Sequence, residues 1–257
     1  MYPSLDASKH VVFVTGATAG FGEATARRFA HAGARVIITG RRADRLEALQ
    51  AELGERCWAH TLDVTDRDAV DAVAAALPQD FADVSVLVNN AGLALGLEPA
   101  WDVDMADWET MVSTNINGLL YCTRALLPAM VARRRGHVIN MSSVAANWPY
   151  PGANVYGATK AFVTQFSLNL RADLHGTGVR VTDIEPGLAE TEFSRVRFKG
   201  DDAKAEAPYA NTRPLTAEDI AESVFWATCL PEHVNINRIE VMSTDQAFGP
   251  FPIHRQG

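Results

Sequence analysis

The sequence has few cysteines, and none of them is arranged for a disulfide framework or a metal site. Cys57, Cys122 and Cys229 are the only three in 257 residues, they lie far apart, and no CxxC pair occurs. This usage excludes a disulfide-stapled fold and a paired-cysteine zinc site, and it indicates a reducing compartment. The seven histidines form no HxxxH pair either, so no metal is expected.

Long apolar runs and an excess of positive charge are also missing. No apolar run reaches the roughly 18 residues that a membrane span requires, and no basic-then-apolar leader opens the chain. We therefore expect a cytoplasmic protein without a membrane partner. The formal net charge of −8 argues against binding to nucleic acid, and an anionic ligand must find a local basic pocket.

The chain does contain alternating strand and helix patterns. Short β-branched apolar runs predict strands over 10–15, 34–39, 56–62, 84–89, 136–141, 179–184 and 236–242. Helical patterns lie between them, over 21–32, 43–53, 66–77, 107–133, 155–175 and 216–229. Strands that are apolar throughout are typical of a parallel sheet covered by helices. We expect an α/β fold: one doubly wound Rossmann domain over 1–257, with a seven-stranded parallel sheet and helices on both faces.

A glycine-rich turn follows the first predicted strand. The stretch "TGATAGFG" places Gly16, Gly20 and Gly22 there, with Thr18 and Phe21 between them. Glycines in a strand-to-helix turn let the backbone approach a pyrophosphate, and the start of the following helix favours an anion. The spacing is GxxxGxG rather than GxGxxG, so a turn without a ligand stays open as an alternative.

The end of the second predicted strand indicates which dinucleotide would bind. NAD-binding proteins of this fold carry an acidic residue about 20 residues after the glycines, where it holds the ribose 2′-hydroxyl. Here Gly40 stands in that place, followed by Arg41 and Arg42. The missing carboxylate and the added guanidinium favour a 2′-phosphate, and so NADP over NAD. Of the two, Arg42 is the one more easily explained as a solvated residue at a helix start.

Tyr156 and Lys160 stand four residues apart in "NVYGATKAF", with only small residues between them. On a helix, this spacing puts both side chains on one face. A cation near a phenol favours the phenolate, so we expect Lys160 to lower the pKa of Tyr156 from its usual value of about 10. Such a tyrosine can exchange a proton with a carbonyl or an alcohol. For this motif alone, an exposed pair without a function remains the alternative.

Together these motifs resemble the short-chain dehydrogenase/reductase family, and the resemblance covers essentially the whole chain. It implies a catalytic group of Asn115, Ser143, Tyr156 and Lys160, in which Asn115 sits on a helix bulge and supports a water and proton relay. It further implies that Lys160 grips the nicotinamide ribose, and that the protein forms a homotetramer. More cofactor contacts follow from the family motifs: Asp63 and Val64 in "LDV", Asn89, Ala91 and Gly92 in "NNAG", and Pro186, Gly187 and Thr191 in "EPGLAET".

The family's catalytic serine has two candidates in "MSSVA". Ser143 lies thirteen residues before Tyr156, which matches the family interval, whereas Ser142 lies fourteen before it. A serine just past a strand can donate a hydrogen bond to a substrate oxygen as charge develops there. We expect Ser143 to do so and Ser142 to make backbone hydrogen bonds.

Within the family, the chain resembles the bacterial NADP-dependent 3-hydroxy acid dehydrogenases. These are also described as serine or L-allo-threonine dehydrogenases and as malonic semialdehyde reductases, and the stretches "NNAGLALGLEPA" and "VRFKGDDAKAE" carry the likeness. The resemblance implies hydride transfer between NADP and a small 3-hydroxy acid or aldehyde acid. "PGLAETEF" and "HVNINRIEVM" also resemble sulfoacetaldehyde reductases, which form isethionate, and these are the alternative. A non-catalytic NADP(H) sensor is a more remote one.

The segment around 188–210 is expected to be a substrate lid. Three of its cations are within reach of a substrate anion: Arg195, Arg197 and Lys199. The alternative is a solvated lid whose cations pair with neighbouring carboxylates such as Glu192. Trp148, in the loop before Tyr156, is expected to shape the pocket wall.

Overall fold

A parallel sheet forms the centre of the protein. The computed structural model describes residues 7–249 and residue 253. In this part of the chain seven parallel strands form one sheet in the order β3-β2-β1-β4-β5-β6-β7. The strands are β1 Val11–Val14, β2 Arg35–Gly40, β3 Cys57–Thr61, β4 Val86–Asn89, β5 Gly136–Met141, β6 Val179–Pro186 and β7 Arg238–Val241. The predicted doubly wound sheet is confirmed, with every strand bound within two residues of its expected place.

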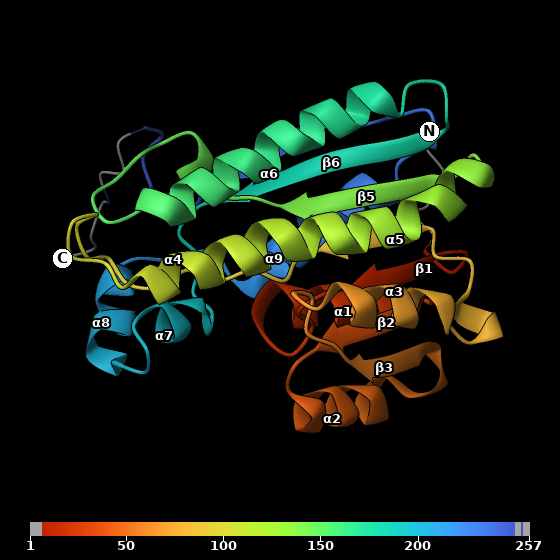
Figure 1. Ribbon diagram of the computed structural model, residues 1–257, viewed down its shortest axis with the longest axis horizontal. Helices are drawn as coiled ribbons and strands as arrows, with labels where there is room; N and C mark the ends of the chain where they lie inside the picture. Colours follow the sequence, from red (N-terminus) through yellow and green to blue (C-terminus); the bar gives the residue numbers. More distant parts are fainter. Residues whose placement is uncertain (1–6, 250–252, 254–257) are drawn as a thin grey trace.

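Helices cover both faces of the sheet (Figure 1). Alternation along the strands explains how, because Val12 and Val14 pack with α1 and α9, whereas Val11 and Phe13 pack with α3, α5 and α6. The helices are α1 Gly20–His31, α2 Ala43–Leu53, α3 Arg67–Ala75, α4 Met105–Val112, α5 Leu119–Ala132, α6 Asn154–Asp173, α7 Phe193–Arg197, α8 Asp202–Glu206 and α9 Ala217–Cys229. Short 3₁₀ turns are η1 Gly54–Arg56, η2 Gln79–Phe81, η4 Val144–Ala146 and η5 Ala207–Tyr209. Among the described residues, no helix is both long and apolar enough to cross a membrane.

The helix predicted over 107–133 is interrupted. Its middle is a π-helical turn, η3 Ser113–Gly118, which separates α4 from α5. Asn115 is buried in this π turn. Its Oδ1 accepts the N–H of Leu93 and its Nδ2 donates to the carbonyl oxygen of Leu93, both at 2.9 Å. Apolar periodicity continues across such a turn, so the sequence pattern alone did not predict the break.

The segment expected to be a lid contains two short helices, α7 and α8, that the sequence did not predict. Each has five residues, which is too short to give a periodic apolar signal. Both lie beyond the carboxyl ends of the strands (Figure 1).

The strand order places a crevice at these carboxyl ends. The chain winds from β1 outward to β2 and β3, then returns to pair β4 on the other side of β1. The loops after β1 and β4 therefore diverge to opposite faces, and open α/β sheets bind ligands at such a point.

Candidate active site

A cleft of about 330 Å³ opens at this point of divergence. The glycine turn lies at one part of its wall, and the tyrosine–lysine pair lies at another. It is lined by thirteen of the residues that the sequence assigns to the cofactor: Gly16, Thr18, Gly20, Phe21, Arg41, Arg42, Asp63, Val64, Ala91, Gly92, Tyr156, Lys160 and Thr191. The structure thus brings together motifs that span most of the chain.

The glycine turn is shaped for close approach of a ligand to the backbone. Gly16 has a φ of +66°, and a Cβ there would lie 2.9 Å from the Cα of Ala91. A Cβ on Gly22 would lie 2.5 Å from the carbonyl oxygen of Gly16, so α1 can begin this close to the turn only with glycine. Ala19, the N-cap of α1, offers no side-chain cap to the first N–H groups. These donors are suited to a pyrophosphate.

Asn89 lies away from the cleft. Its amide nitrogen donates to Thr123 Oγ1 and to Asn140 Oδ1, both at 2.9 Å, and so links β4 to α5 and β5. The next residue, Asn90, lines the cleft in its place. Its Nδ2 donates to the carbonyl oxygens of Thr15 at 2.9 Å and of Gly16 at 3.1 Å. The sequence signal for Asn90 was present, because strand alternation turns the second asparagine of "NNAG" to the opposite side from the first.

Pro186 and Gly187 also lie outside the cleft wall. Gly187 donates its N–H to the carbonyl oxygen of Val241 at 2.7 Å and packs on Gln246. These two residues set the course of the chain from β6 toward Thr191, which does line the cleft.

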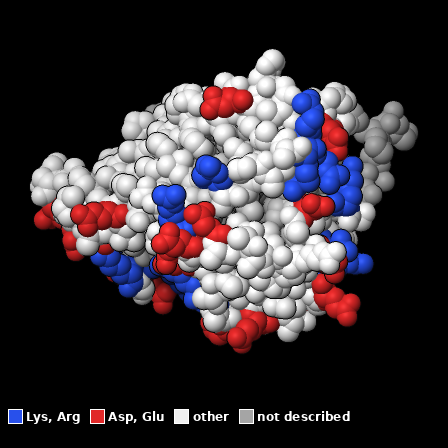
Figure 2. Space-filling model, turned by 45° about the vertical axis from the view of Figure 1, so that its right-hand side comes forward, with Lys and Arg blue, Asp and Glu red and all other residues white. Residues whose placement is uncertain are grey.

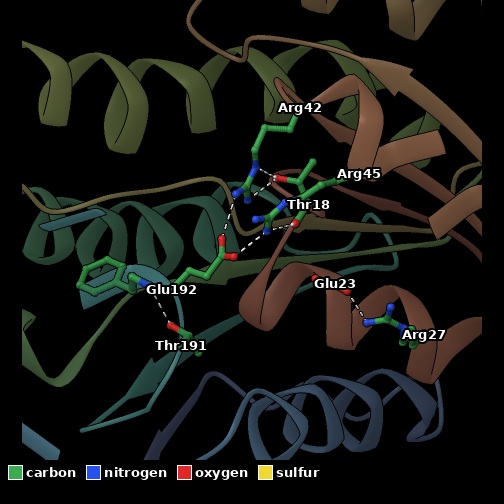
Figure 3. A network of polar contacts seen from close by, with 8 residues as sticks. Thr18, Glu23, Arg27, Arg42, Arg45, Thr191 and Glu192 are labelled. Atoms are coloured by element: carbon green, nitrogen blue, oxygen red, sulfur yellow. Dashed lines mark hydrogen bonds and ion pairs between the residues drawn. The ribbon is translucent and has the colours of Figure 1, made fainter. Parts of the chain in front are cut away.

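The two arginines after β2 both line the cleft, where the sequence predicted contacts to the cofactor. Arg42, for which a solvated helix-start residue was the alternative, donates from Nε and Nη2 to Thr18 Oγ1 at 3.0 and 2.8 Å. It also pairs with Glu192 at 2.9 Å (Figure 3). Arg45, in the first turn of α2, also belongs to this network, because its Nη1 reaches Glu192 at 2.6 Å. No sequence motif marked this residue. Arg41 lies exposed at the cleft wall.

Tyr156 and Lys160 share a buried face of α6, with exposed fractions of 7% and 6%. Lys160 Nζ lies 5.9 Å from the centre of the Tyr156 ring and donates to the carbonyl oxygen of Met141 at 2.8 Å. Burial lowers the pKa of Lys160 to about 8, while the charge of Asp183 raises it. The structure therefore excludes an exposed pair at these two positions.

The expected lowering of the Tyr156 pKa by Lys160 is not what the structure gives. Burial raises the pKa of Tyr156 above its usual value, and Tyr150 adds to that increase. A hydrogen bond with Ser143 and the charge of Arg197 act in the opposite direction but are weaker. Desolvation dominates because the phenol is enclosed by the packed structure, which disfavours the charged phenolate.

The two serines after β5 point in different directions. Ser142 Oγ donates to the carbonyl oxygen of Lys160 at 2.9 Å and lies 2.9 Å from Thr164 Oγ1, so it supports α6. Ser143 is the serine whose hydroxyl acts on Tyr156, where it lowers the pKa of the phenol; its Oγ also donates to Pro186 O at 3.4 Å and accepts the N–H of Ala145 at 3.1 Å. Asn115 contacts α6 between Tyr156 and Lys160, because its Nδ2 donates to Thr159 Oγ1 at 3.0 Å.

Only one of the three cations that the sequence singled out in the segment 188–210 turns toward Tyr156. Arg195 pairs with Asp202 at 3.1 Å and Lys199 with Asp107 at 2.8 Å, and both side chains are about 60% exposed. Arg197 instead lies 5.5 Å from the centre of the Tyr156 ring. Its Nε donates to Gly96 O at 3.1 Å, while Nη2 is buried without a hydrogen-bond partner in the described part of the chain.

Trp148, which the sequence predicted to shape the pocket wall, packs instead on the C-terminal segment. Its ring packs edge-on against Phe248, with 5.1 Å between the ring centres. Trp148 is not among the residues that line the cleft, whereas Phe193, which stands 5.6 Å from the Tyr156 ring, lines it together with Phe21.

Charge is otherwise mixed on the surface. On the face in Figure 2, acidic and basic side chains are interspersed, and the basic ones gathered at its right-hand side stand beside acidic ones.

Among residues 7–249 and 253, no group of three or more histidine, cysteine, aspartate or glutamate side chains could hold a metal ion.

The chain belongs to the short-chain dehydrogenase family, whose model matches residues 10–202. It is 62% identical to the NADP-dependent 3-hydroxy acid dehydrogenase YdfG of Salmonella typhimurium, over 95% of this chain and 99% of that protein. It is 56% identical to sulfoacetaldehyde reductase 2 of Chromohalobacter salexigens, over 95% of this chain and 98% of that protein. A solved structure of the closed form of serine dehydrogenase complexed with NADP+ is similar, with a TM-score of 0.92, 59% identity and coverage of 95% of this chain and 99% of that one.

The buried lysine makes stability depend on pH in a defined direction. Because the folded pKa of Lys160 is about 8 and its unfolded pKa is 10.5, the unfolded chain binds more protons between these values. The free energy of unfolding is therefore expected to rise between pH 8 and 10, by about 2 kcal/mol from this group. Urea denaturation of wild type and Lys160→Met at both pH values measures it. An equal pH dependence in the two proteins would contradict the assignment.

Proposed function

We propose that the protein is an NADP-dependent oxidoreductase that transfers a hydride between the nicotinamide and a small 3-hydroxy acid. The observation that carries this proposal is a single cleft whose wall contains two groups of residues. One group is the glycine turn with Arg41 and Arg42, which suits an anion, and the other is the buried pair of Tyr156 and Lys160. Two of the relatives named above, the 3-hydroxy acid dehydrogenase and the serine dehydrogenase, carry a hydroxy acid in their names, and both are named with NADP.

The cofactor would lie along the cleft wall with its phosphates at the glycine turn. The uncapped start of α1 suits the pyrophosphate, and Arg41 and Arg42 suit a 2′-phosphate. Asp63 and Val64 would border the adenine, and Lys160 would donate to the nicotinamide ribose. The nicotinamide, when bound, supplies or accepts the hydride.

The proton would move at Tyr156. Burial raises the pKa of the phenol and keeps it protonated at neutral pH. In the reductive direction the phenol can therefore donate its proton to the carbonyl oxygen of the substrate, while the carbonyl carbon accepts the hydride. Ser143 would donate a hydrogen bond to the same oxygen. Asn115 would hold the loop after β4 and α6 in register, and its helix bulge is suited to support a proton relay from solvent.

Arg197 would bind the substrate anion. Its inward position and its buried, unpartnered Nη2 within the described residues make it suited to a carboxylate beside Tyr156. A sulfonate would satisfy the same group, and the relative named sulfoacetaldehyde reductase 2 gives that substrate a specific basis. The segment 188–210, with α7 and α8, would close over the substrate as a lid.

We further propose a cytoplasmic homotetramer. Buried Cys57 and Cys122 are free thiols, which suits a reducing compartment. Large apolar side chains lie exposed and are available for contacts between subunits: Trp101, Met105, Val112 and Leu168.

A substrate panel tests the proposed reaction. Absorbance of reduced nicotinamide is followed with L-serine, 3-hydroxypropionate and isethionate, each with NADP and with NAD. We expect the highest kcat/KM with NADP and one of the two hydroxy acids, and a Tyr156→Phe variant at least about 10³-fold slower with nearly unchanged NADPH affinity. A preference for isethionate would favour the sulfonate alternative, and tight NADPH binding without turnover would favour a sensor.

Removal of Arg41 tests recognition of the 2′-phosphate. Arg41→Ala is expected to weaken NADPH binding about tenfold to a hundredfold, because a charge-assisted contact is lost, and to leave NADH binding nearly unchanged. Titration of nucleotide fluorescence with both cofactors measures this, and an equal loss for NADH would remove the case for phosphate recognition.

Removal of the inward lid cation tests substrate recognition. Arg197→Met is expected to lower kcat/KM about tenfold to a hundredfold for the hydroxy acid, with a much smaller effect on an uncharged alcohol. Arg195→Met is the matched control, since that guanidinium faces outward and pairs with Asp202. Similar losses in both variants would contradict a specific role for Arg197.

A further inference from the structure

Glu192 connects two parts of the cleft that are far apart in the sequence. It stands at the start of α7, and its carboxylate bridges Arg42 at 2.9 Å and Arg45 at 2.6 Å, at the start of α2 (Figure 3). Arg42 at the same time holds Thr18 in the glycine turn. The lid segment is therefore attached directly to the residues that surround the proposed 2′-phosphate position.

The other end of α7 reaches the proposed substrate position. The helix has only five residues, so about 7 Å of rigid backbone separates Glu192 from Arg197. Arg197 both donates to Gly96 O and accepts the N–H of Gly96 through its own carbonyl, at 3.1 and 2.9 Å. A displacement of the first residue of so short a helix must displace the last one as well.

We infer that Glu192 is a positioning residue that couples the cofactor's 2′-phosphate site to the substrate-binding Arg197 through α7. This inference rests on the proposed function, since that function assigns the ligands of Arg42 and Arg197. The ion pairs of Glu192 with Arg42 and Arg45 fix the start of α7 against the cofactor end of the cleft. Because α7 is a short rigid helix, they also fix the guanidinium of Arg197, which would meet the substrate anion at its other end.

The chemistry of the bridge suits this role. Although partial burial raises the pKa of Glu192, hydrogen bonds from Arg42 and Arg45 outweigh it and hold that pKa below its usual value, so the carboxylate is charged at neutral pH. A guanidinium has five N–H donors, and Arg42 uses three contacts on Thr18 and Glu192, which leaves donors for a phosphate. Next to the bridge, Thr191 packs against Gly20 and accepts the N–H of Phe193 at 3.2 Å.

Hydrogen exchange measures the coupling directly in the full-length protein. The N–H groups of Val196 and Phe198 donate to the carbonyl oxygens of Glu192 and Ser194, each at 3.0 Å, and their exchange reports the opening of α7. In Glu192→Gln and in Arg45→Ala they are expected to exchange about threefold to tenfold faster than in wild type, and the double variant is expected to match the single ones. Glu190→Gln is the control, because Glu190 is exposed in the same segment and outside the bridge.

Kinetics at saturating NADPH separates positioning from simple loss of fold. In Glu192→Gln and Arg45→Ala, KM for the acid substrate is expected to rise about threefold to tenfold with kcat changed less than about twofold, although neither side chain meets the substrate. Unchanged exchange and KM, or equal changes in Glu190→Gln, would overturn the coupling. If wild type binds no NADPH, the proposed function fails instead, and the exchange comparison in the free protein still decides whether the bridge holds α7.

Discussion

The site depends on one buried contact, the hydrogen bond from Lys160 Nζ to the carbonyl oxygen at the end of β5. It fixes α6 against the carboxyl edge of the sheet, and with it the position of Tyr156 one turn earlier. Lys160 and Tyr156 are both buried on this face of α6. The enclosure then determines the electrostatics, because desolvation outweighs the nearby positive charges at the phenol.

The fold and the outline of the cleft could be predicted from the sequence because the signals are local. Strands such as "VVFV" are apolar on both faces, and the glycines of "TGATAGFG" occur where a backbone turn needs a positive φ at Gly16 and Gly20. Helical spacing alone placed Tyr156 and Lys160 on one face. Each of these inferences uses residues that are close together in the chain.

What could not be predicted depends on contacts between distant segments. The pairing of Glu192 with Arg42 and Arg45 joins residues separated by about 150 positions, and no local pattern marks it. The same holds for the direction of Arg197, since its neighbours Arg195 and Lys199 have the same charge but point elsewhere. Desolvation of Tyr156 also required the packed structure, because the number of groups that enclose a side chain cannot be counted from spacing.

The π turn at Ser113–Gly118 has a consequence for how the chain tolerates changes in its length. It holds an extra residue, so α5 is rotated by about 100° relative to a continuous helix with α4. Deleting one residue here would restore a regular helix, but then either Asn115 or the core side chains of α5, such as Cys122 and Leu126, would turn away from their partners. A single-residue insertion or deletion here would therefore break one of these two sets of contacts, and the length of the stretch is as much a part of the site as the residues it carries.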